Sequence, residues 1–171
     1  RHIRQLARDG IRTIVNLRDE RECGSYRLER EACARAGIAL VNFGVKSRGA
    51  PAKDRIHGAK ALFETVEYPI LMHCKSGADR AGLMSVLYRV FRLGEPVEVA
   101  LQQLDWRFGH FKQADTGVLD YFFAKYLEAN ASSPIGFLDW VDSVYEPDAL
   151  KAEFQSKKFA NLLVNWALRR E

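Results

Sequence analysis

The sequence alternates short β-branched runs with helical patterns, and this alternation constrains the fold more than any other feature. Three such runs cover Ile11 to Leu17, Ile38 to Val45 and Pro69 to Cys74, and each is bounded by glycine, proline or charged residues. Helical patterns at residues 25–36 and 51–66 separate the three runs. A β-α-β-α-β order brings each strand back in the same direction, so it predicts a parallel sheet.

The chain after Cys74 carries no further strong strand signal and is expected to be helical. Helical segments are predicted at residues 78–93, 96–108, 116–129, 135–144 and 147–168. Earlier in the chain, Gly37 suits a helix C-terminal cap and Pro51 suits a first helical position. We therefore expect an α/β fold in three layers, with a short, parallel-dominated sheet, helices on both faces and a helical C-terminal half. Residues 1–171 would form one domain, with residues 130–171 as a helical C-terminal extension.

Composition excludes several classes of protein. A chain of 171 residues with 47% hydrophobic residues can bury an adequate core without disulfides or metals. Its apolar runs fall far short of the ~18 residues that span a bilayer. The net charge of +4 suits anionic substrates. Nucleic acid is disfavoured, since basic residues do not alternate with stacking aromatics and no recognition-helix pattern occurs.

Cysteine usage indicates a reducing compartment. Cys23, Cys33 and Cys74 make an odd count, and none belongs to a CxxC pair or to a Cys/His pattern with zinc spacing. We expect neither a disulfide framework nor a metal or other cofactor, and a cytoplasmic location. Because the first residue is Arg1 and not methionine, we expect the sequence to be a trimmed or processed product.

The run from His73 to Arg80, HCKSGADR, lies where the most apolar predicted strand enters a helix. Backbone N–H groups converge at a helix N-terminus, so a loop there can bind phosphate. The same field favours a thiolate, which makes Cys74 a candidate nucleophile, and Arg80 can offer two N–H groups to two phosphate oxygens. An inert thiol and a surface arginine are the alternatives. The expected phosphate-binding residues are Lys75, Ser76, Gly77, Ala78, Asp79 and Arg80.

HCKSGADR resembles the HCxxGxxR signature of the protein tyrosine phosphatase superfamily, in its compact dual-specificity branch. Residues 10–20, GIRTIVNLRDE, also resemble the first core strand of those proteins. The resemblance implies a phosphatase that forms a phosphocysteine on Cys74 and needs no cofactor. It also implies an acid that protonates the leaving oxygen before water releases the phosphate.

Two positions depart from the family pattern. Ala81 stands where the family usually has serine or threonine, so hydrolysis of the intermediate is expected to be slow. The family's acid follows the second core strand, and the matching position falls near Ser47 or Arg48, which are not acidic. We expect Asp79 to act as the acid, since the adjoining thiolate and phosphate favour its protonated form, or else to pair with the helix N-terminus or a loop amide. Asp54 is the second candidate.

Basic residues are expected around the same site, because ligands gather at the carboxyl ends of parallel strands. Arg18 follows the first strand, Lys46 and Arg48 follow the second, and Lys75 follows the cysteine, as in lipid phosphatases of the tensin-homologue type, which this loop resembles. This charge predicts a phosphoinositide, an inositol phosphate, a phosphoglycolipid or a phosphoprotein as substrate. Gln113 is a candidate water-orienting amide.

Several alternatives stay open. The protein could bind phosphorylated ligands without turnover as a pseudophosphatase, or it could be a sulfur-transfer or arsenate-reducing enzyme. In residues 105–115, the aromatic side chains are expected in the core, with Arg107 and His110 at the rim. The last helix, residues 147–168, is expected to pack on the core, and contact with a membrane surface is the alternative.

Overall fold

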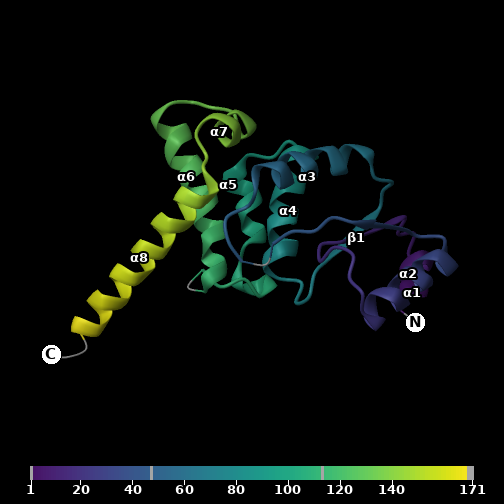
Figure 1. Ribbon diagram of the computed structural model, residues 1–171. Coiled ribbons are helices and arrows are strands. Elements are labelled where there is room, and N and C mark those ends of the chain that lie inside the picture. The colour runs from purple at the N-terminus through teal and green to yellow at the C-terminus, as the bar shows by residue number, and fades with distance from the viewer. Residues whose placement is uncertain (1, 47, 113, 169–171) are drawn as a thin grey trace.

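The computed structural model describes residues 2–46, 48–112 and 114–168, with side chains described as far as residue 159. Helices and strands alternate through β3, and only helices follow it in these ranges (Figure 1). The elements are α1 (His2–Arg8), β1 (Thr13–Asn16), α2 (Gly24–Ala36), β2 (Ala39–Asn42), α3 (Lys53–Thr65), β3 (Ile70–His73), α4 (Asp79–Phe91), α5 (Val97–Ala100), η1 (Leu101–Gln103), η2 (Trp106–Phe108), η3 (Asp115–Gly117), α6 (Val118–Ser132), α7 (Phe137–Ser143) and α8 (Pro147–Leu168).

The sheet is short and parallel. Its strand order is β2-β1-β3, and both neighbours run parallel to β1. The register pairs Asn16, at the end of β1, with Asn42 and with His73, so the three strands end at one edge. All four residues of β1 are buried, as expected for a central strand covered on both faces.

Helices cover both faces of this sheet. Ile14 packs with Cys33 of α2 and with residues of α1 in a small cluster. The next residue, Val15, points to the opposite face and joins the main core with α3, α4 and α6. Figure 1 shows α1 and α2 on one side and the larger helical body on the other. The predicted α/β fold class is therefore confirmed.

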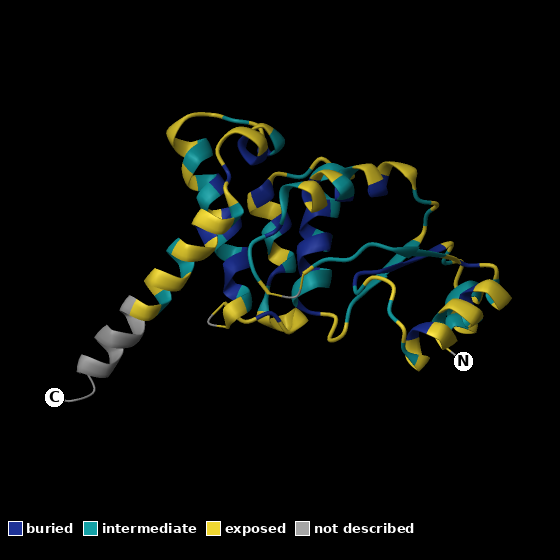
Figure 2. Ribbon diagram, viewed as in Figure 1, coloured by how far each residue is buried: buried dark blue, intermediate teal, exposed yellow. Residues whose placement is uncertain are grey.

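The main core lies between the sheet and the helices of the second half. Phe122 and Phe123 of α6 are fully buried, and Phe122 contacts Trp140 and Tyr145. Figure 2 shows buried residues concentrated in these helices and mostly exposed residues along the described part of α8. Within the described part of α8, Leu150 is buried in the core and Phe154 packs against it. None of the described helices is long and apolar enough to cross a membrane.

Two local predictions were wrong. The helix predicted at residues 96–108 is broken into α5, η1 and η2, because Leu104 leaves the helical region (ψ 75°) and Asp105 caps a new turn through the Arg107 N–H. Pro51 precedes α3 and is not its first residue. By contrast, Gly37 ends α2 in the left-handed region, as predicted.

Candidate active site

The loop from Cys74 to Ala78 joins the end of β3 to the start of α4. It begins where the three strands end, and its backbone turns back on itself at Gly77, whose φ is +77°. This turn directs the Gly77 N–H toward Cys74 Sγ, at an N···S distance of 3.3 Å. His73 lies outside the loop, and its Nε2 contacts Glu29 of α2 at 2.7 Å.

The environment of Cys74 favours its thiolate. Burial favours the neutral thiol, but the backbone N–H groups of Ala81, Gly77 and Ser76 and the charge of Arg80 outweigh it. The pKa of Cys74 is therefore below its ordinary value. The loop thus favours a nucleophilic sulfur through amides that converge at the start of α4.

Arg80 lies in the first turn of α4 and reaches back to the sheet edge. Its Nη1 donates to the carbonyl oxygen of Leu17, which directly follows β1, at 3.5 Å. The same oxygen accepts the N–H of Val45, at 3.1 Å. This carbonyl therefore holds the guanidinium beside the carboxyl ends of the strands.

A cleft of about 590 Å³ contains most of the residues that the sequence singled out. Its lining residues include Arg48, Cys74, Lys75, Ser76, Asp79 and Arg80. The loop and one of the expected basic residues are thus brought together. The opening has room for a phosphate and for part of the group that carries it.

The other expected basic residues lie outside this cleft. Lys46 borders a narrow passage beside Asp79 and Arg80. Arg18 is absent from the described lining, and its backbone N–H binds Asn16 Oδ1 at 3.0 Å. Gln113 lies outside the described residues.

The structure does not favour Asp54 as the acid. Asp54 lines a separate cavity of about 330 Å³ beside α3, and Cys74 is not among the residues around it. Its carboxylate accepts a hydrogen bond from Arg55 Nε at 3.0 Å. That bond lowers the pKa of Asp54, which favours the ionised form over the proton donor. Ser47 falls outside the described residues.

Residues 105–115 differ from the sequence-based expectation. Trp106, Phe108 and Phe111, expected in the core, are 72%, 51% and 58% exposed. His110, expected at the rim, is only 2% exposed. Short 3-10 turns leave these aromatic side chains on the outside, whereas a continuous helix would have presented one face inward.

His110 contacts two carboxylates, one of them on the candidate acid. Its Nδ1 lies 2.8 Å from Asp79 Oδ1, and its Nε2 lies 2.6 Å from Asp120 Oδ2 in α6. From the sequence we expected Asp79, if it is not the acid, to pair with the helix N-terminus or a loop amide, yet the observed partner is a buried imidazole. A histidine 31 residues away in sequence gives no local signal that could have revealed this contact.

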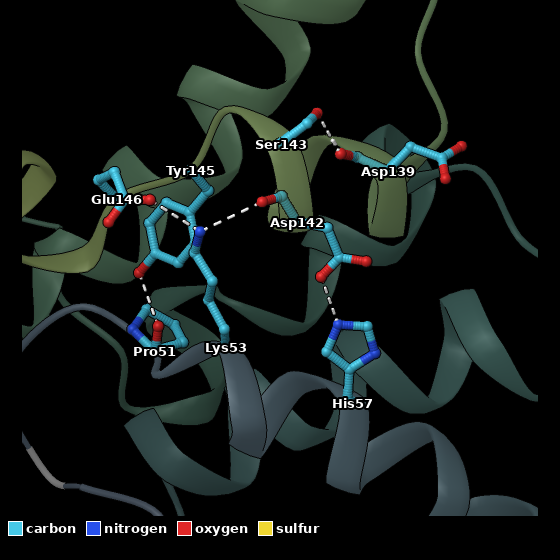
Figure 3. Close-up of polar contacts among 8 residues, drawn as sticks. All are labelled: Pro51, Lys53, His57, Asp139, Asp142, Ser143, Tyr145 and Glu146. Atoms are coloured by element: carbon cyan, nitrogen blue, oxygen red, sulfur yellow. Dashed lines mark hydrogen bonds and ion pairs between the residues drawn. The ribbon is translucent and has the colours of Figure 1, made fainter.

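A second group of contacts ties the segment before α3 to the C-terminal helices (Figure 3). The buried hydroxyl of Tyr145 donates to the carbonyl oxygen of Pro51 at 2.7 Å. Lys53 Nζ lies 2.8 Å from Glu146 Oε1, and His57 Nε2 lies 2.6 Å from Asp142 Oδ1. Of these contacts, the one from Tyr145 to Pro51 fixes the end of the segment that carries Lys46 and Arg48.

Comparisons with known proteins agree with this geometry. A family model described as "DSP-PTPase phosphatase fused to NAD+ Kinase" matches residues 2–117. Protein tyrosine phosphatase domain-containing protein 1 of Mus musculus is 34% identical over 103 residues, or 53% of this chain. The match spans only 14% of the mouse protein.

Two solved structures share the fold. Tk-PTP in its active form gives a TM-score of 0.56 at 20% identity, with 75% of this chain and 84% of that chain covered. Kinase associated phosphatase, crystallised with its catalytic-site cysteine replaced by serine, gives 0.55 at 18% identity, with 73% and 75% covered. At such identities the likeness concerns the fold alone.

Proposed function

The chain belongs to the DSP-PTPase phosphatase family, and on that premise we propose that it hydrolyses phosphate monoesters through a phosphocysteine on Cys74. The family and its relatives make it a protein tyrosine phosphatase-like hydrolase. The observation that carries the proposed mechanism is the thiol of Cys74 with its lowered pKa, which shares one cleft with Arg80.

In the first step, the Cys74 thiolate attacks phosphorus. The S–P bond forms while the bond from phosphorus to the leaving oxygen breaks, and Asp79 gives its proton to that oxygen. Arg80 offers two N–H groups to the phosphate oxygens, on which negative charge is stabilised.

In the second step, water attacks the phosphocysteine. Asp79, now a carboxylate, takes a proton from the water, the S–P bond breaks, and inorganic phosphate leaves while the Cys74 thiolate returns. The backbone N–H of Ala81 favours the departing thiolate. The side chain of Ala81, however, lacks the hydroxyl that the family usually has at this position to help expel the thiolate. Because that hydroxyl is missing, we expect hydrolysis of the phosphocysteine to limit the rate.

The substrate we propose carries negative charge beyond the reacting phosphate. Lys75 and Arg48 line the cleft and Lys46 borders the adjoining passage, so a second anionic group would meet cations there. A phosphoinositide, an inositol phosphate, a phosphoglycolipid and a phosphoprotein all meet this requirement. NADP+ belongs in the same panel, because the family description names NAD+ kinase and the product of that kinase carries a phosphate monoester.

The first experiment compares wild type with Cys74→Ser on 4-nitrophenyl phosphate, with Cys23→Ser as the matched control. Cys23 is a second thiol whose pKa is lowered, by a hydrogen bond from Ser25, but it lies outside the cleft. Cys74→Ser should remove activity and Cys23→Ser should keep it. A burst of 4-nitrophenol followed by slower turnover would support the rate-limiting second step.

Two results would reject this proposal. Activity of Cys74→Ser within tenfold of wild type would exclude the cysteine nucleophile. Tight phosphate binding by wild type, without turnover of any substrate in the panel, would instead favour the pseudophosphatase alternative.

A further inference from the structure

His110 is a buried histidine whose two ring nitrogens both face carboxylate oxygens. Its side chain is 1% exposed, and the side chains of Asp79 and Asp120 are 26% and 21% exposed. Three elements supply the group: Asp79 begins α4, His110 follows η2, and Asp120 lies in the first turn of α6. A polar chain therefore runs from the wall of the Cys74 cleft to the helical C-terminal half.

The number of protons in this chain follows from its geometry. A neutral imidazole has one N–H and one lone pair, so it can donate to only one of two ionised carboxylates. The other nitrogen would then direct its lone pair at a carboxylate oxygen less than 3 Å away, which is repulsive. Both contacts are hydrogen bonds when each holds one proton, carried by the ring nitrogen or by the facing carboxyl group. Lys112 Nζ also lies 3.7 Å from Asp120 Oδ1.

We propose that His110 is a positioning residue for the proton transfer by Asp79: its Nδ1 donates to Asp79 Oδ1, and its contact with Asp120 holds the ring in place. In this arrangement His110 supplies the hydrogen for its contact with Asp79 Oδ1. Asp79 can then gain or lose a proton on Oδ2 without breaking that contact. One oxygen fixes the carboxyl group, and the other serves the leaving oxygen and then the attacking water. This inference rests on the proposed function.

The position of Asp79 makes such support necessary. It stands directly before Arg80 and lines the same cleft as Cys74, so its carboxyl group must keep one orientation through both steps. A short side chain at a helix start can otherwise turn to cap backbone N–H groups. The contact with His110 opposes that rotation, because leaving it would strand a buried imidazole nitrogen without its acceptor.

The test uses two amides that each imitate one nitrogen of the ring. The Asn amide group reaches about as far as Nδ1, and the Gln amide group reaches about as far as Nε2. His110→Asn therefore keeps a donor toward Asp79 and loses the contact with Asp120, whereas His110→Gln does the reverse. Each variant loses one contact, so the losses of stability should be similar.

Activity should separate the two variants when the leaving group is varied. Benzyl phosphate has a poor, alkyl-like leaving group that needs a proton, whereas 4-nitrophenolate leaves without one. With general acid catalysis worth about a hundredfold to ten-thousandfold, His110→Gln should lower kcat/KM for benzyl phosphate by at least about tenfold. For 4-nitrophenyl phosphate it should stay within about threefold of wild type, and His110→Asn should stay within about threefold on both substrates.

A double variant tests whether His110 acts through Asp79. Asp79→Asn should show the same preference for the good leaving group, and adding His110→Gln to it should cause no further loss on benzyl phosphate. His57→Gln is the matched control, because His57 also contacts an aspartate, Asp142, but is exposed and lies on α3 (Figure 3). It should leave both substrates unchanged.

The outcomes that overturn the inference are distinct from failure of the proposed function. Equal losses on both substrates in His110→Gln and His110→Asn would mean that His110 only stabilises the fold. Equal losses in Asp79→Asn would remove the proton transfer and with it the inference, while the Cys74 mechanism would stand. If His110→Gln does not fold, Asp120→Asn takes its place, and an equal loss on both substrates there would also overturn the inference.

Discussion

Replacing Gly77 with alanine tests how firmly the loop holds its backbone. Gly77 has a φ of +77°, and an added Cβ would meet no atom within 4 Å, so the cost of alanine is conformational and not steric. Forcing an alanine into the left-handed region costs about 1–2 kcal/mol. Against this, the contact of the Gly77 N–H with the Cys74 thiolate is worth about 1.5–3 kcal/mol, as is typical of hydrogen bonds to charged groups.

Because the contact outweighs the strain, Gly77→Ala should keep the loop conformation at the expense of stability. We expect the free energy of unfolding to fall by about 1–2 kcal/mol, which lowers Tm by roughly 2–8 °C in a chain of this size. The loss in kcat/KM for 4-nitrophenyl phosphate should stay below about tenfold, since the strain amounts to about one power of ten. Thermal unfolding by circular dichroism and steady-state kinetics measure the two quantities.

Two further variants calibrate this experiment. Gly77→Asn should lose less stability, since asparagine tolerates the left-handed region better than alanine. Gly10→Ala places the same strain (φ +87°, again with open space around the Cβ) in the turn after α1, and it should cost similar stability with unchanged activity. The reasoning would be refuted if Gly77→Ala lost more than about a hundredfold in kcat/KM with unchanged stability, because the loop would then have left its conformation.

Three more predictions follow from the same contacts. Alkylation of Cys74 by iodoacetamide should persist to lower pH than alkylation of free cysteine, because its pKa is lowered, whereas Cys33, whose pKa burial raises, should stay unreactive; equal rates at the two cysteines would contradict this. Tyr145→Phe strands a carbonyl oxygen and should lower the free energy of unfolding by about 1–3 kcal/mol in urea, and a loss below about 0.5 kcal/mol would contradict it. Lys75→Ala and Arg48→Ala should weaken turnover of an inositol polyphosphate more than of 4-nitrophenyl phosphate, and equal losses would assign both cations to the reacting phosphate or to the fold.

The sequence predicted the sheet well, and it placed the run from Cys74 to Arg80 correctly between a strand and a helix, because both depend on local signals. A buried central strand needs consecutive apolar or β-branched residues, and Thr13 to Asn16 lies within the predicted run. The cysteine, the glycine and the arginine of the loop are separated by a few residues, and their spacing, together with the predicted strand before them and helix after them, indicated one anion site. In the structure, Cys74 and Arg80 line one cleft.

Prediction failed where the chain changes direction every few residues. Residues 96–108 have the composition of a helix. The turn at Leu104, however, depends on packing against α4 and on the cap from Asp105, and the hydrophobic periodicity of the sequence reveals neither. Once the helix is broken, the inward and outward positions of the following residues no longer follow a helical period. Phe111 is therefore exposed where the prediction buried it, and His110 is buried where the prediction exposed it.

Residues 105–115 connect the candidate acid, Asp79, to the helical second half of the chain through His110. Because Asp79 lies inside the loop, beside Arg80, a contact from another element is needed to hold the orientation of its carboxyl group. Asp79 has that support from His110, and His110 in turn from Asp120, which lies beyond residue 117, where the match to the family model ends. Tyr145 fixes Pro51, in the segment that follows Lys46 and Arg48. The helices after residue 117 therefore contribute to the geometry of the site as well as to the core.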